Sequence, residues 1–197
     1  MKIMLVLLFN NIWVYIKTLL CFMEEVIMEL WDIYDKNRNL TGRTMERGGE
    51  FAKGDFHLIV HLCIFNSKNE LLIQQRQAWK EQWPNMWAIT VSGSAQAGES
   101  STQAIERETF EEIGYKIDLS KERPFFTINS EHGFHDYYIV EREIDIKDLN
   151  LQHEEVQAVK WASKDEVLKL LEEGKFLKYW FIEPLFDIRK HRGPYRK

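Results

Sequence analysis

The chain has 197 residues, which is enough for one domain with a short appendage. Hydrophobic residues make up 45% of it, and it has only four prolines and ten glycines, so the composition excludes a disordered or collagen-like chain. The formal net charge of −5 argues against general nucleic-acid binding driven by charge. Two cysteines, Cys21 and Cys63, exclude a disulfide-dense secreted scaffold and favour a reducing, cytoplasmic location.

Residues 1–27 form an apolar extension that differs in composition from the rest of the chain. They contain no small-residue cleavage site of a signal peptide. Asn10 and Lys17 interrupt the apolar run that a membrane helix needs, and their spacing of seven places them on one stripe of an amphipathic helix. Such a helix packs on the domain, a partner or a bilayer surface, and the alternative is a start-site artefact. We therefore expect membrane contact only through residues 1–22.

The remaining chain is predicted to form one domain over residues 28–190, followed by a basic tail at 191–197. Branched and aromatic residues bounded by turn signals predict seven strands, over residues 30–35, 56–65, 71–75, 87–91, 123–129, 134–140 and 156–161. We expect a hairpin turn at residues 67–69, where the second and third of these strands pair. Residues 41–54 are rich in glycine and charge and are predicted to be loop, as is the Trp- and Pro-containing segment 79–87.

Helices are predicted at three places. Residues 100–113 begin with a capping box formed by Ser100 and Gln103 and stop at Gly114, and residues 163–173 begin with a second capping box. A last helical stretch, 176–190, contains Pro184, which we expect to kink or split it. Strands interrupted by a few helices predict a mixed α/β sandwich.

The predicted helix 100–113 carries three carboxylates, Glu108, Glu111 and Glu112, at positions i, i+3 and i+4. These side chains project from one face, where like charges repel unless a cation offsets them. Oxygen ligands suit Mg²⁺ or Mn²⁺ rather than Zn²⁺. Glu99 precedes the helix and can fold back toward the same place, and Arg107 can pair with an acid and orient it.

The segment from Gly93 to Tyr115 resembles the Nudix box, G-x5-E-x7-R-E-U-x-E-E-x-G-U, where U is a bulky aliphatic residue. The matching residues are Gly93, Glu99, Arg107, Glu108, Glu111, Glu112 and Gly114. Thr109 and Tyr115 depart from the pattern at positions that concern packing rather than metal ligation.

This resemblance implies a mixed β-sheet sandwiched between α-helices, with the box as loop–helix–loop. It also implies hydrolysis of the diphosphate linkage in a nucleoside diphosphate joined to another moiety. Glu108, Glu111 and Glu112 would then be the metal ligands, Glu99 would support the loop or the metal, and Arg107 would orient a glutamate.

In this family the general base often lies outside the box. Glu154 and Glu155 are the candidates, with Glu131 and Asp136 as alternatives.

A wider stretch is similar to the branch of the family that contains type I isopentenyl-diphosphate isomerase. The shared features are a strand pair ending at Arg76, a loop with Pro84, and then Trp87. The isomerase has a catalytic cysteine before the box glycine and a histidine metal ligand after it, where this chain has Ser92 and Ser94. An isomerase-like activity is therefore the less favoured alternative, although His57 matches another histidine ligand of that enzyme.

Arg76, Trp87 and Gly93 are the candidate substrate-binding residues, because a guanidinium suits phosphate oxygens and an indole can stack on a base. His57, His61 and Cys63 alternate along one predicted strand, but four-ligand zinc geometry is not supported. A non-catalytic, ligand-sensing Nudix domain is the alternative outside enzymes. The expected partners are a small-molecule diphosphate substrate and a second copy of the chain in a homodimer, with nucleic acid restricted to a capped RNA end.

Overall fold

The computed structural model describes residues 29–191, so the expectations for residues 1–27 and for most of the basic tail lie outside the described residues. The main sheet has seven strands: β3 (His57–Phe65), β4 (Leu71–Arg76), β5 (Trp87–Ala88), β6 (Val91–Ser94), β7 (Phe126–Asn129), β8 (Gly133–Glu141) and β9 (Val156–Ala162). Its order is β5-β4-β3-β8-β7, with β6 on β3 and β9 on β4.

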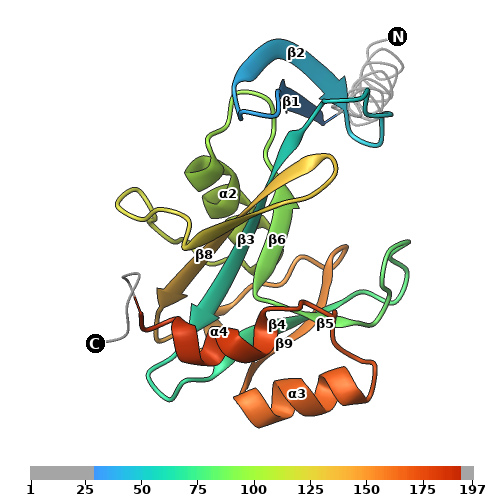
Figure 1. Ribbon diagram of the computed structural model, residues 1–197. Coiled ribbons are helices and arrows are strands. Elements are labelled where there is room, and N and C mark those ends of the chain that lie inside the picture. The colour runs from blue at the N-terminus through green and yellow to red at the C-terminus, as the bar shows by residue number, and fades with distance from the viewer. Residues whose placement is uncertain (1–28, 192–197) are drawn as a thin grey trace, which may run out of the picture.

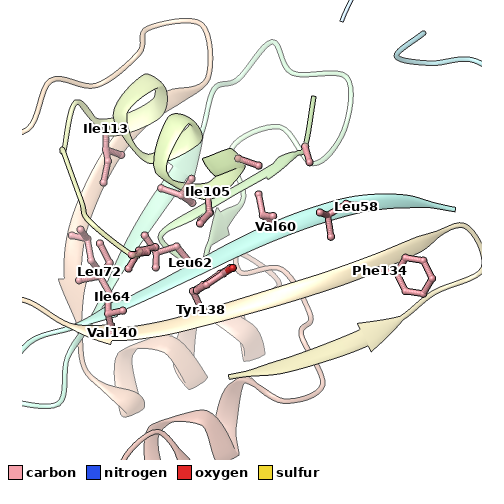
Figure 2. Packing of buried hydrophobic residues seen from close by; sticks show 14 residues of the cluster. Leu58, Val60, Leu62, Ile64, Leu72, Ile105, Ile113, Phe134, Tyr138 and Val140 are labelled. Carbon is pink, nitrogen blue, oxygen red and sulfur yellow. The ribbon is translucent and has the colours of Figure 1, made fainter. Parts of the chain in front are cut away.

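Strand β3 lies at the centre of the molecule, and eight of its nine residues are buried, most of them apolar. It runs parallel to β8 over its whole length and antiparallel to β6 (Figure 1). One face carries Leu58, Val60, Leu62 and Ile64, which pack with Ile105 and other apolar residues of helix α2 (Ser101–Ile113) (Figure 2). The other face packs against two C-terminal helices, α3 (Lys164–Glu172) and α4 (Ile182–Ile188). The predicted sheet between helices is confirmed.

Helix α2 begins and ends where the sequence predicted. The Ser100 side chain accepts from the Gln103 backbone N–H, the Gln103 side chain accepts from Ser100 N–H, and both bonds of the capping box are present. Gly114 ends the helix in the left-handed region, at φ 68°. A Cβ at Gly114 would also lie 2.8 Å from the Cβ of Asn150, so both conformation and space require glycine.

The loop predicted for residues 41–54 is wrong over its first part. Residues Leu40–Glu46 form strand β2, which pairs antiparallel with β1 (Leu30–Tyr34) in a separate two-stranded sheet. Strand β2 is exposed along almost its whole length, so it lacks the alternation of apolar and polar residues by which strands are recognised. The hairpin is held to the main sheet by an ion pair between Arg38 and the fully buried Asp136.

Three other expectations need correction. The predicted strand 87–91 is divided into β5 and β6, since the Thr90 hydroxyl between them hydrogen-bonds Leu72 O and Ile64 N. Strand β4 pairs with β3 only at Leu71 and pairs mainly with β9. Residues 176–181 are not helical, and Pro184 causes no kink because it lies in the first turn of α4, where its missing N–H costs no helical bond.

The rest of the chain order holds with shifted bounds. Helix α3 follows a capping box formed by Ser163 and Glu166, as predicted. Strand β7 begins at Phe126 rather than 123, and a short 3-10 helix, η1 (Ile146–Asp148), precedes β9. No helix within residues 29–191 has the length and apolar character needed to cross a bilayer.

Candidate active site

The carboxylate end of the Glu108 side chain, on helix α2, lies directly against Gly93 of strand β6. A Cβ built on Gly93 would lie 2.1 Å from the carboxyl carbon of Glu108 and 2.2 Å from one of its oxygens. The glycine therefore lets a carboxylate of the helix lie directly on the backbone of the strand. This contact fixes where the acidic face of α2 meets the sheet.

Arg107 holds the acids around it in one cluster. Its Nε and Nη2 donate to the two carboxylate oxygens of Glu99, at 2.7 and 2.9 Å. Its Nη1 donates to Glu108 at 3.0 Å and to Glu111 at 2.9 Å, and Nη2 also reaches the carbonyl oxygen of Ser94. One guanidinium thus joins the loop before the helix, strand β6 and two of the box glutamates.

Glu112 lies deepest in the cluster, and its side chain accepts a hydrogen bond from Gln74 Nε2 at 2.8 Å. Burial, and then the neighbouring charge of Glu108, raise the pKa of Glu112 to about 8. Burial also raises the pKa of Glu108 to about 7, although Arg107 acts in the opposite direction. A buried and a half-buried carboxylate, both with raised pKa values, form a site in which added positive charge is stabilising.

These acids line a pocket of about 610 Å³. The lining also has basic and aromatic side chains, since Arg76 comes from the end of β4, Lys80 from the following loop, and Trp31 and Arg47 from the hairpin β1–β2 and its end. Three further acids complete the charged lining: Glu29, Glu81 and Glu155. Lys80 pairs with Glu155 at 2.6 Å, and Arg47 pairs with Glu29 at 2.7 Å. The pocket therefore brings an acidic face and a set of cations together around one polar space.

The comparisons with known proteins identify the family of this chain. Residues 55–182 match the model of the NUDIX domain family. The chain belongs to the Nudix family. A Listeria monocytogenes protein named as an uncharacterized Nudix hydrolase is 46% identical over 162 residues, which cover 82% of this chain and 96% of that protein. At the level of the family, this confirms the expectation of a hydrolase acting on diphosphate bonds.

The similarity to the isomerase branch is also confirmed. An isopentenyl-diphosphate Delta-isomerase of Pectobacterium atrosepticum is 30% identical over 144 residues, covering 68% of this chain and 76% of the isomerase. Among solved structures, a protein from Deinococcus radiodurans superposes with a TM-score of 0.64 at 18% identity, over 83% of this chain and all of that one. The last comparison shows the fold alone.

The structure brings most of the predicted Nudix site residues together. The pocket is lined by Arg76, Gly93, Arg107, Glu108, Glu111, Glu112 and Glu155. Glu99 is outside the lining and accepts hydrogen bonds from Arg107 and from the backbone N–H of Gln96. Trp87 is outside the lining and contacts Lys160, and Glu154 is exposed.

The two alternative bases also lie elsewhere. Glu131 is exposed beside His132. The carboxylate of Asp136 accepts hydrogen bonds from Arg38 and from the Thr127 hydroxyl. Sequence reasoning missed Trp31, Arg47 and Lys80, which lie in segments without a motif. For Lys80 a weak signal existed, because it follows Arg76 by four residues in the loop that the isomerase branch shares.

The donor set fits a hard divalent cation, since every box acid offers oxygen and burial raises the pKa values of Glu108 and Glu112. Within residues 29–191, no three His, Cys, Asp or Glu side chains are yet arranged to hold one metal ion. Arg107 donates to one oxygen of Glu108 and to one oxygen of Glu111.

Proposed function

We propose that this Nudix hydrolase uses Mg²⁺, with Mn²⁺ as a substitute, to cleave the diphosphate linkage of a nucleoside diphosphate joined to a second moiety. Glu108, Glu111 and Glu112 would hold the cation. The observation that carries the proposal is the pocket itself, whose lining combines these acids with Arg76, Lys80 and Arg47. A bound divalent cation would neutralise the diphosphate and make a water molecule more acidic.

The chain's own groups have separable tasks in this reaction. Arg76 and Lys80 bind phosphate oxygens and stabilise the charge of the departing phosphate, since a guanidinium and an ammonium suit those oxygens. Glu155 lines the pocket whereas Glu154 does not, so Glu155 is the better candidate for taking the proton of the attacking water. Arg107 orients Glu108 and Glu111 and ties them to Glu99.

The experiment is product-resolved turnover by mass spectrometry. The protein is incubated with nucleoside diphosphate sugars, dinucleotides, coenzymes, a capped RNA end and isopentenyl diphosphate, each with Mg²⁺, with Mn²⁺ and with chelator. We expect metal-dependent mononucleotide products that disappear in the Glu111→Gln, Glu112→Gln variant. Isomerised isopentenyl diphosphate with its diphosphate intact would contradict the hydrolase, and ligand-induced thermal shifts without turnover would indicate a sensing domain.

The homodimer and the cytoplasmic location stay predictions. Light scattering tests the homodimer, which we propose by family resemblance. We also propose a cytoplasmic location, because the chain has only two cysteines, and fractionation of cells tests it.

A further inference from the structure

Strand β4 carries one buried polar side chain, Gln74, directly after a run of apolar residues. The preceding residues, Leu71–Ile73, are fully buried, and Gln74 itself is only 4% exposed. Its backbone is fixed on both sides, because it pairs with Ala88 of β5 and with Val159 of β9. A buried amide costs free energy unless it is hydrogen-bonded, so the partner of this side chain is informative.

The partner of Gln74 is the box glutamate that lies deepest in the site. Nε2 of Gln74 donates to Oε2 of Glu112 at 2.8 Å, and no other hydrogen bond reaches this carboxylate from residues 29–191. Glu112 lines the pocket, whereas Gln74 does not. Gln74 therefore acts on the site through Glu112, whose second carboxylate oxygen accepts no bond from the described residues.

Gln74 differs in charge from the group that holds the other box acids. Glu108 and Glu111 both accept hydrogen bonds from the cationic guanidinium of Arg107. Glu112 forms no ion pair with any residue between 29 and 191, and its donor is a neutral amide. A cationic donor offsets part of the charge of a carboxylate, whereas a neutral donor fixes its orientation and leaves the charge for a metal ion.

We propose that Gln74 is a positioning residue, which fixes the Glu112 carboxylate for binding of the divalent cation. This inference rests on the proposed function, because it concerns the same cation site. Removal of an outer partner that orients a metal-binding side chain typically lowers metal affinity about 10- to 100-fold. The effect of Gln74 is therefore an effect on metal affinity, and it depends on the presence of Glu112.

The chain offers a matched control at Gln77, which is 5% exposed and also outside the pocket lining. Its Nε2 donates to the carbonyl oxygen of Val156 at 3.3 Å. Gln77→Met thus removes a buried amide whose partner is backbone, and Gln74→Met removes one whose partner is a box acid. Met is an unbranched side chain of similar length that adapts to apolar surroundings, so both variants keep the side-chain volume nearly unchanged.

The first arm measures Mn²⁺ binding to the full chain without substrate, from the EPR signal of free Mn²⁺. We expect Gln74→Met to bind Mn²⁺ about 10- to 100-fold more weakly than the native chain, and Gln77→Met to bind it equally well. In a Glu112→Gln background, Gln74→Met should cause no further loss, because Gln74 acts through that carboxylate. The same loss with and without Glu112, or the same loss in Gln77→Met, would show a merely structural role and overturn the proposal.

The second arm uses the native chain, so it stays informative even if Gln74→Met does not fold. Mg²⁺ is titrated into the protein while the ¹H–¹⁵N signals of the glutamine side-chain amides are recorded. The Gln74 amide is bonded to Glu112, so we expect its signals to shift at the same Mg²⁺ concentrations as the backbone signals of α2, and those of Gln77 to stay. Gln74 signals that do not move at saturating Mg²⁺ would overturn the proposal.

The failure of this inference and that of the proposed function are distinguishable. If Glu112→Gln binds Mn²⁺ as tightly as the native chain, Glu112 is not a ligand, and the proposed ligand set fails together with the role of Gln74. If Glu112→Gln weakens Mn²⁺ binding and Gln74→Met does not, the proposed ligand set stands and the role of Gln74 is refuted.

Discussion

The two faces of strand β6 differ in the sequence separation between the residues that contact one another there. Beneath Gly93, the acidic face is built from contacts between residues of one segment, 93–112. On the opposite face, the side chain of Ser92 is hydrogen-bonded to His61, which lies 31 positions earlier in the chain. His61 is in turn hydrogen-bonded to His135, which lies 74 positions later. The first face has a sequence motif because its geometry is local, and the second has none because it forms only when three strands pair.

The two faces also shift ionisation in opposite directions. Burial raises the pKa values of Glu108 and Glu112 on the acidic face and lowers those of His57 and His61 on the other. Both shifts favour neutral groups in a buried setting. Only the acidic face, with several carboxylates together, gains from an added cation.

The largest expected effect is the loss of activity in Glu112→Gln. Gln keeps the shape of Glu112 but removes a charged oxygen ligand, so we expect kcat to fall by about 10³-fold. Because burial opposes the charge of Glu112, the melting temperature should stay equal or rise. Steady-state kinetics and calorimetry measure the two quantities, with the exposed Glu172→Gln on α3 as the control. If kcat of Glu112→Gln fell only in proportion to a loss of folded protein, shown by a lower melting temperature, the role of Glu112 would be structural.

The histidine face predicts a pH dependence of stability. The pKa of His57 is about 4 in the folded protein, because of its burial, and about 6.5 in an unfolded chain. The unfolded state therefore binds more protons, so this stabilisation is complete above pH 6.5 and is lost as the pH falls toward 4. The expected loss from His57 is about 2 kcal/mol between pH 7 and pH 5.

The measurement is urea unfolding of the native chain and of His57→Phe at both pH values. Phe preserves the stacking of His57 on Trp31, 4.4 Å between centroids, and removes Nδ1, which has no hydrogen-bond partner among the described residues. Glu108 and Glu112 act in the opposite direction in both proteins, so the difference between the proteins isolates His57. If the native chain and His57→Phe lost the same unfolding free energy between pH 7 and pH 5, His57 would not be the source of the pH dependence.

Gly93→Ala tests the contact that joins the two faces. The new Cβ would overlap the Glu108 carboxyl group, so either that side chain or the strand must shift. We expect a loss of about 1–2 kcal/mol in unfolding free energy and a 10-fold lower kcat/KM. Adding Glu108→Ala removes the overlap, and the double variant should recover the stability but not the activity. If the losses of unfolding free energy in the two single variants simply added in the double variant, the overlap would not be the cause of the destabilisation by Gly93→Ala.

The sequence predicted what is encoded locally. The Ser100–Gln103 capping box and Gly114 define α2 within one segment, and the spacing of Glu108, Glu111 and Glu112 places them on one face. Strand β2 was missed because pairing with β1 and the Arg38–Asp136 ion pair, rather than an apolar face, hold it. Trp31 and Lys80 were missed because their place in the pocket depends on tertiary packing.

The smallest expected effect concerns Arg47, which lies outside the segment that matches the Nudix family. Its side chain is 63% exposed and paired with Glu29, so its attraction for an anionic substrate is screened by solvent and salt. We expect Arg47→Gln to raise KM about 3-fold at low salt with kcat unchanged, and the effect to vanish near 1 M salt. Lys53→Gln, exposed and outside the pocket lining, is the control. An unchanged KM would mean that the hairpin only encloses the pocket, whereas a lower kcat would place Arg47 with the acids of α2 in the chemical step.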